Sequence, residues 1–150
     1  MVEFKYRKGD MLANLDKASI FLHANNSKGR WSRGIASSFA KKFPGAYLEH
    51  RNRVNKVGTG YVLEDKGFKI GCLITSKGFG AFVDPPKVIT INTYHAVKSL
   101  LESIPDMEVV IQSPKINSGL FKTPWQWTRK AITKACRESE KKVIWVVWEL

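Results

Sequence analysis

At 150 residues and 43% hydrophobic content, the chain is long enough to fold as one domain with a substantial apolar core. No apolar run approaches the ~20 residues of a membrane-spanning helix, and the first residues lack a signal-peptide pattern, so we expect an intracellular protein, cytoplasmic or nuclear, without a membrane partner. The net charge of +12 favours an anionic ligand or partner, although it also fits a surface that only keeps the protein dissolved.

The first half of the chain alternates short apolar runs with helical patterns. The almost wholly apolar run over 19–24 is typical of a buried strand. Ile35, Phe39 and Phe43 recur at a spacing of four, which indicates one buried helix face. Pro44 ends that helix and opens another, because proline fits only the first turn. The predicted elements are strands over 4–8 and 19–24, helices over 34–43 and 44–51, and a hairpin that pairs 61–63 with 68–75.

The second half continues this alternation. The segments 76–86 and 114–124 are rich in Gly, Ser and Pro and are predicted to be loops. A helical pattern begins at Pro86 and stops at Pro105. The remaining predicted elements are a strand over 108–112, a helix from 125 to about 138 with Trp127, Ile132 and Cys136 facing inward, and a strand over 143–148.

Strands that alternate with helices favour an α/β domain whose largely parallel sheet is covered on both faces. The sequence contains no repeat, low-complexity segment or linker, so we predict a single domain over residues 1–150 and a monomer. Cys72 and Cys136 stand apart, without a CxxC pair or a histidine at zinc spacing. We therefore predict reduced structural cysteines and neither a metal nor a cofactor.

The segment over 20–39 has the pattern of an anion site. An apolar strand breaks into a polar loop containing Gly29, and a helix then begins at Gly34. The N–H groups of a helix N-terminus have no intrahelical partners and, with the helix dipole, favour bound phosphate. Asn25 and Asn26 precede this loop and supply amides suited to hydroxyl groups. The pattern therefore indicates a ligand that carries both phosphate and sugar.

Three predicted loops, 25–34, 76–86 and 114–124, each follow a buried strand. Ligands of open α/β sheets bind outside the carboxyl ends of the strands, so we expect these loops to share one site. In the third loop, Ser118 and Gly119 allow close backbone approach and Phe121 is suited to covering a ring, although the same residues also fit an ordinary turn.

Two basic clusters are predicted to attract phosphorylated ligands or polyanions. The first contains Lys28, Arg30, Arg33, Lys41, Lys42, Arg51, Arg53 and Lys56. The second contains Lys122, Arg129, Lys130, Lys134, Arg137, Lys141 and Lys142, on and around the last predicted helix.

Four motifs in order carry a resemblance to a known family. They are Lys8-Gly9-Asp10-Met11, His23-Ala24-Asn25-Asn26, the segment Gly29 to Ala36, and Asn117-Ser118-Gly119-Leu120-Phe121 with Pro124-Trp125. Together they resemble a macro domain, in particular the fungal ADP-ribose-1″-phosphate phosphatases and, more distantly, the terminal ADP-ribose protein glycohydrolases. The resemblance covers essentially the whole chain.

The resemblance implies a three-layer α/β/α sandwich, with a mixed and largely parallel central sheet, that binds ADP-ribose across the strand ends. Asp10 would accept a hydrogen bond from the adenine amino group, with Met11 beside it, although an aspartate after glycine is also a common turn or cap residue. Asn26 and Asn25 would contact the distal ribose. The backbone of Gly34, Ile35 and Ala36 would hold one side of the diphosphate, and the third loop, Asn117, Ser118, Gly119, Leu120 and Phe121, would hold the other.

For catalysis, the candidates are His23, Asp84 and, less directly, Lys77. A histidine at the end of a buried strand is suited to activating water, or it is a core residue hydrogen-bonded to backbone. Asp84 lies in Phe79–Pro86, which also resembles fungal members of the family, and equally fits a helix cap. His95 falls within a helix and is predicted to have a surface or packing role.

The chain also departs from the family pattern. Ser32 and Arg33 stand where yeast relatives have glycines, and Lys122 replaces a glycine after the third-loop aromatic. Arg33 has a guanidinium suited to a terminal phosphate. Ser76 and Phe121 occupy the apparent positions of the lysine and aspartate that the terminal glycohydrolases use, so a covalent lysine mechanism is not expected unless Lys77 has taken that role.

The leading hypothesis is therefore an ADP-ribose-binding domain that hydrolyses ADP-ribose-1″-phosphate to ADP-ribose and phosphate. One alternative is an ADP-ribosyl hydrolase that acts on modified proteins or nucleic-acid ends held by the basic faces. Another is an ADP-ribose reader without catalysis. A plain RNA-binding protein is supported by charge alone, because the chain contains no recognised nucleic-acid motif.

Overall fold

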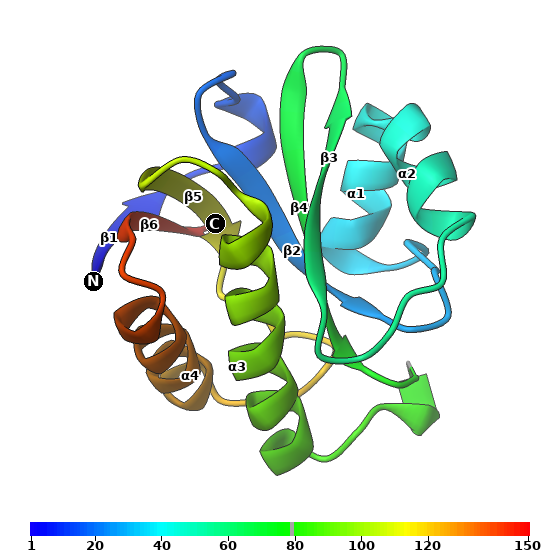
Figure 1. The fold of residues 1–150 in the computed structure, drawn as a ribbon. Coiled ribbons are helices and arrows are strands. Elements are labelled where there is room, and N and C mark those ends of the chain that lie inside the picture. Colours follow the sequence, from blue (N-terminus) through cyan, green and yellow to red (C-terminus); the bar gives the residue numbers. More distant parts are fainter. Residues whose placement is uncertain (79) are drawn as a thin grey trace.

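The computed structural model describes residues 1–78 and 80–150, and within them six strands form one sheet (Figure 1). The strand order is β1-β6-β5-β2-β4-β3. The strands are β1 (Val2–Lys8), β2 (Ile20–Asn26), β3 (Gly60–Asp65), β4 (Phe68–Ser76), β5 (Glu108–Pro114) and β6 (Lys142–Glu149). The helices are α1 (Gly34–Lys42), α2 (Pro44–Arg51), α3 (Pro86–Ser103) and α4 (Trp125–Glu138), with short 3-10 turns η1 (Met11–Ala13) and η2 (Gly80–Phe82).

The predicted mixed, largely parallel sheet is confirmed. Strand β3 pairs antiparallel with β4, and every other pairing is parallel. One predicted boundary is wrong, because Asn25 and Asn26, expected at the start of a loop, are the last residues of β2. The reason is the partner strand: β4 continues to Ser76 and pairs with both asparagines across a register shift.

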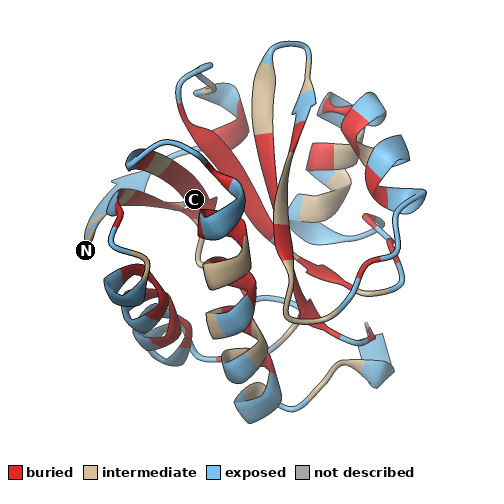
Figure 2. Cartoon of the chain, in the orientation of Figure 1, coloured by how far each residue is buried: buried red, intermediate tan, exposed pale blue. Residues whose placement is uncertain are grey.

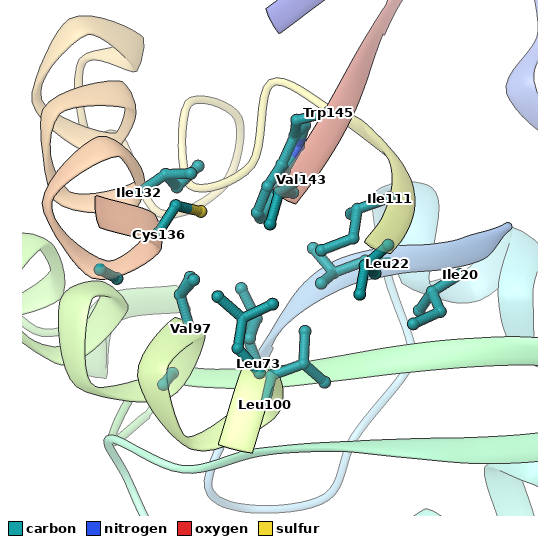
Figure 3. Close-up of a cluster of buried hydrophobic side chains, with 14 of the residues drawn as sticks. Ile20, Leu22, Leu73, Val97, Leu100, Ile111, Ile132, Cys136, Val143 and Trp145 are labelled. Carbon is teal, nitrogen blue, oxygen red and sulfur yellow. The ribbon is translucent and has the colours of Figure 1, made fainter. Parts of the chain in front are cut away.

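Helices cover both faces of the sheet, as predicted. One core lies between the sheet and the helices α3 and α4, and Figure 3 shows side chains of Val97, Leu100, Ile132 and Cys136 from these helices meeting those of the sheet. The second core lies on the opposite face, where Phe39 and Phe43 pack on Phe21. In Figure 2 the central strands and the inward helix faces are largely buried, while the outer helix faces and much of the edge strands β1 and β3 are exposed or partly exposed. No helix in the described ranges is long and apolar enough to cross a bilayer.

One prediction about the inward face of α4 is wrong. Ile132 and Cys136 are buried as expected, but the Trp127 side chain is 41% exposed. The buried stripe is built on Thr128, Ile132 and Cys136, at a spacing of four residues. Trp127 lies about 100° around the helix from Thr128, so its ring falls at the edge of the core.

The topology places a ligand site at the carboxyl end of β2. Strand β2 lies between β4 and β5. The chain leaves β2 towards α1, which packs in the second core, whereas the helices that follow β4 and β5 pack in the first. Connections that diverge to opposite faces leave a crevice between adjacent strand ends, which is where ligands of open α/β sheets bind.

Trp31 fastens the loop after β2 to the second core. Its side chain is 2% exposed, and its indole Nε1 donates to Asn25 Oδ1 at 2.6 Å. The ring stacks on Tyr47 and lies against His50 and His23, with centroids 5.1, 4.9 and 4.6 Å away, respectively. A loop that is otherwise polar is thereby held in one position before α1.

The two histidines beside Trp31 are buried and neutral. Burial, with a smaller contribution from electrostatic repulsion by His50, lowers the pKa of His23 from 6.5 to about 3. Burial and the nearby Arg53 lower the pKa of His50 to about 4. The hydroxyl of Tyr61 donates to Asn55 Oδ1 and therefore accepts from His50 Nδ1, which defines the tautomer of His50.

We expect the free energy of unfolding to fall as the pH is lowered from 7 to 5. Because the pKa of each imidazole is near 6.5 in the unfolded chain and about 3 and 4 in the folded protein, the unfolded state binds more protons below pH 6.5. At pH 5, the pKa difference of His23 alone lowers the free energy of unfolding by about 2 kcal/mol. Urea unfolding at both pH values measures the loss. His23→Phe keeps a ring against Phe39 but does not titrate, so an unchanged pH dependence in this variant would contradict the assignment.

Candidate functional site

The three loops predicted to share a site contact one another. The first meets the second where Ser27 N donates to Ser76 O at 2.9 Å and Ser27 Oγ to Lys77 O at 2.5 Å. The second loop's strand meets the third loop where Thr75 Oγ1 donates to Asn117 Oδ1 at 2.8 Å. All three follow carboxyl strand ends and lie at the lower edge of the sheet in Figure 1.

The N-terminus of α1 has the features of an anion site. The N-cap, Arg33, makes no side-chain capping hydrogen bond, and Gly34 and Ile35 are exposed. Gly34 has a φ of +57°, a conformation that glycine adopts readily. The first N–H groups of this nine-residue helix therefore have no intrahelical partner and lie at the positive end of the dipole.

The third loop lies directly against this helix end. A Cβ on Gly34 would be 3.5 Å from Cδ1 of Leu120. Ser118, Gly119 and Leu120 are exposed. Among the described residues, the N–H groups of Gly119, Leu120 and Phe121 make no hydrogen bond, whereas neighbouring N–H groups close the turn. Two adjacent segments, the N-terminus of α1 and the third loop, therefore each supply free backbone N–H donors.

Asn117 positions that loop through its side chain. It has a φ of +68° and is buried, and its Nδ2 donates to Thr93 Oγ1 at 2.9 Å and Thr128 Oγ1 at 3.3 Å. Together with the bond from Thr75, the amide connects β4, α3 and α4. The loop backbone is thus held by three elements. The resemblance assigned this residue to ligand binding, and in the structure its amide is occupied by protein partners.

The two asparagines of β2 also bind protein groups. Asn25 Nδ2 donates to the carbonyls of His23 and Leu73 at 2.8 and 3.3 Å, and Oδ1 accepts from Trp31. Asn26 accepts from Lys28 N at 2.9 Å and donates to Arg30 O at 3.1 Å. Asn25 thereby holds the Trp31 indole, while Asn26 shapes the loop. No role was predicted for Trp31 from the sequence, although a large aromatic residue in an otherwise polar loop is a sign of a buried anchor.

Asp10 and Met11 lie at the end of β1 in the 3-10 turn. Asp10 is exposed, and its Oδ1 accepts from Leu12 N at 3.1 Å, so it caps η1. Its second carboxylate oxygen is free to accept another donor. Met11 is buried in the second core beneath the turn.

The catalytic candidates occupy different environments. His23 has no exposed surface: its ring centroid lies 4.4 Å from that of Phe39, and its Nδ1 is 3.4 Å from Ala24 O. Asp84 is half-buried, and its Oδ2 accepts from Lys77 N at 2.7 Å. The helix-cap interpretation of Asp84 is wrong, because α3 begins after Pro85 and has no side-chain cap. Asp84 instead closes the second loop on itself. Phe79 of the fungal-like segment lies outside the described residues.

The residues that depart from the family pattern lie on the surface of the site. Ser32 and Arg33 are exposed at the entry to α1, and Arg33 has an extended backbone. Lys122 is exposed with a φ of +55°. Glycine adopts this left-handed backbone at no cost. With lysine at this position, the chain keeps the shape of the loop but its backbone is strained there. His95 is exposed on α3, as predicted.

Comparison with known proteins identifies the family of the chain. A sequence model of the macro domain family matches residues 22–132. The chain is 34% identical to the ADP-ribose 1″-phosphate phosphatase of Debaryomyces hansenii, covering 87% of this chain and 92% of that one. It is also 34% identical to the enzyme of the same name from Candida albicans, covering 85% and 90% of the two chains, respectively.

Solved structures show the same fold. The macrodomain of Mycobacterium tuberculosis DarG superimposes with a TM-score of 0.77 at 16% identity, covering 99% of this chain and 98% of that one. Thermosipho africanus DarTG, solved in complex with ADP-ribose, superimposes with a TM-score of 0.69 at 14% identity, covering 95% and 41% of the two chains, respectively. With the family pattern across most of its length and the sandwich around β2, this chain belongs to the macro domain family.

Proposed function

We propose that the chain binds ADP-ribose at the carboxyl ends of β2, β4 and β5 and hydrolyses ADP-ribose-1″-phosphate. The observation that carries the proposal is the uncapped N-terminus of α1 beside the free N–H groups of the third loop. Such backbone donors on two sides suit a diphosphate. The fungal relatives named ADP-ribose 1″-phosphate phosphatase support the choice of substrate.

In the proposed complex, backbone N–H groups of Gly34, Ile35 and Ala36 hold one side of the diphosphate and those of the third loop hold the other, with Phe121 packed near a ribose. The free oxygen of Asp10 accepts from the adenine amino group. Asn26 keeps one N–H and one lone pair for the distal ribose.

Asn25 is assigned a positioning role rather than a ligand contact. Both of its N–H groups and one lone pair are occupied by protein partners. Its amide holds Trp31, and through Trp31 it sets the position of the loop that precedes α1. The same reasoning applies to Asn117, whose amide holds the third loop from three sides.

The proposed chemistry is attack of water on phosphorus. The bond between phosphorus and the C1″ oxygen breaks, the ribose oxygen leaves and takes up a proton, and inorganic phosphate forms. Backbone N–H groups stabilise the charge on the phosphoryl oxygens. Asp84 orients and deprotonates the water with the oxygen that Lys77 N does not occupy. His23 is placed outside the reaction because its ring is fully buried.

Asp84→Asn is expected to lower phosphate release from ADP-ribose-1″-phosphate by about 100-fold or more, because a positioned general base contributes about that factor. Binding of ADP-ribose, measured by calorimetry, should change little. His23→Phe, which keeps an apolar ring against Phe39, serves as the matched control and should retain turnover. The assignment fails if the two variants show the opposite order of activity.

Arg33→Ala is expected to weaken binding of ADP-ribose-1″-phosphate by about tenfold while leaving ADP-ribose affinity unchanged, because a charge-assisted hydrogen bond to the terminal phosphate is lost. Calorimetry with both ligands measures the difference. Ser32→Ala, the adjacent exposed position, is the control. Equal weakening for both ligands would show that Arg33 does not select the phosphomonoester.

The side chains at positions 32 and 33 also favour a second candidate, an ADP-ribose reader without catalysis, because they stand where close backbone approach was expected. Heat on titration with ADP-ribose but no phosphate release would select the reader. Release of ADP-ribose from modified protein or nucleic-acid ends would select the ADP-ribosyl hydrolase.

A further inference from the structure

The outer face of α4 is a continuous basic surface away from the proposed ligand site. The helix carries four cations and one acid, Glu138, on its exposed positions. Glu138 accepts from Tyr94 and forms an ion pair with Lys98. Of the four cations, Lys134 also interacts electrostatically with Glu138, and its Nζ lies over the Tyr94 ring at 4.8 Å. A shallow groove runs along this face, lined by Gln126, Arg129, Lys130, Thr133, Lys134 and Arg137.

The spacing of these residues makes them one stripe. The lining residues recur at intervals of three and four, so they share one side of the helix. The cations from Arg129 to Arg137 extend over about 12 Å of helix axis. Two ion pairs form among residues 1–78 and 80–150, and neither involves any of these four cations. Figure 2 shows this side of the helix exposed.

Two lysines of the second predicted basic cluster, Lys141 and Lys122, do not belong to this stripe. Lys141 is buried, and its Nζ donates to the carbonyls of Ile104 and Asp106, each at 2.6 Å. Lys122 lies in the third loop, near the proposed ligand site. Lys142, the remaining member, is exposed at the start of β6 and lies outside the helix, so the continuous basic surface is the α4 stripe itself.

Exposed aromatic rings border the stripe. Trp127, 41% exposed, lies on the helix flank that also carries Lys130 and Lys134. On the other flank, Tyr6 of the edge strand β1 is 46% exposed, and its hydroxyl accepts from Arg129 at 3.0 Å. The Arg129 guanidinium also lies over the Phe4 ring at 4.7 Å, which holds it in place.

We propose that this α4 surface binds single-stranded nucleic acid. Unpaired cations along a groove follow a phosphate backbone, and exposed aromatic rings stack with unpaired bases, a combination typical of single-strand sites. A lipid bilayer fits less well, because the apolar side of α4 is packed in the first core and cannot enter a membrane. The proposal is independent of the phosphatase activity.

The test is fluorescence anisotropy with a labelled single-stranded oligonucleotide of about 12 nucleotides, within the range of known single-strand site sizes. The variant Lys130→Gln/Lys134→Gln/Arg137→Gln should weaken binding at least tenfold and reduce the slope of log affinity against log salt by about 2. Arg129 is left unchanged because it packs on Phe4.

The matched control is Lys41→Gln/Lys42→Gln/Lys66→Gln, which removes three exposed charges on the α1 side of the sheet. It should retain most of the affinity. Trp127→Ala should weaken binding about tenfold, and Trp127→Phe should restore it, because any aromatic ring supports stacking. ADP-ribose binding should be unchanged in all four variants, which separates this proposal from the proposed function.

Absence of oligonucleotide binding by the unmodified chain would overturn the proposal, as would equal losses in the two triple variants. Binding to vesicles containing phosphatidylserine without binding to the oligonucleotide would also overturn it and identify an anionic bilayer as the partner.

Discussion

The burial of Trp31 is the constraint on which the proposed site depends. The indole is surrounded by Tyr47, His50 and His23, and its N–H is held by Asn25. A buried indole N–H without an acceptor is costly, so Asn25 and Trp31 specify each other's positions. The loop over 27–33 has few apolar side chains of its own, and this anchor determines where the N-terminus of α1 begins.

The same neighbourhood explains why two histidines remain neutral in the interior. His23 and His50 pack as aromatic rings, and burial makes their charged forms unfavourable. The Nε2 atom of each lacks a hydrogen-bond partner within the described structure. The second core therefore combines aromatic packing with two polar rings. In the first core, on the α3 and α4 side, the buried residues are aliphatic apart from Cys136 and Trp145 (Figure 3), and the aromatic residues Phe4, Tyr94 and Trp125 pack at its edge.

Asn117 has the corresponding role on the other side of the site. Its amide is shared among threonines from β4, α3 and α4, and its left-handed backbone turns the chain towards Gly119. Both walls of the proposed diphosphate site are thus positioned by buried asparagine side chains, and the proposed contacts to the diphosphate itself come from the backbone. A backbone site of this kind depends on the shape of its loops, and Asn25 and Asn117 hold that shape.

Apolar patterns, together with the position of Pro44, predicted the α-helices and strands of the described residues to within a few residues, because apolar stripes follow the 3.6- or 2-residue repeat of an element, but they did not predict the two short 3-10 turns. The same patterns also predicted the parallel sheet with both faces covered, and the loops that meet at the carboxyl edge. Local spacing could not predict whether the Trp127 side chain is buried, since a shift of one residue rotates a side chain by about 100° and moves it from the core to the edge of the helix.

The sequence by itself determined the fold, the strand-to-helix anion pattern around Gly34, and the family resemblance, because these depend on residue types and their order along the chain. Only the tertiary structure decided which polar side chains are free. Asn25 and Asn117 are hydrogen-bonded to groups on β4, α3 and α4, and His23 is buried against Phe39 of α1. Those partners lie far away in sequence, and a side chain's availability depends on what the fold brings within hydrogen-bond distance of it.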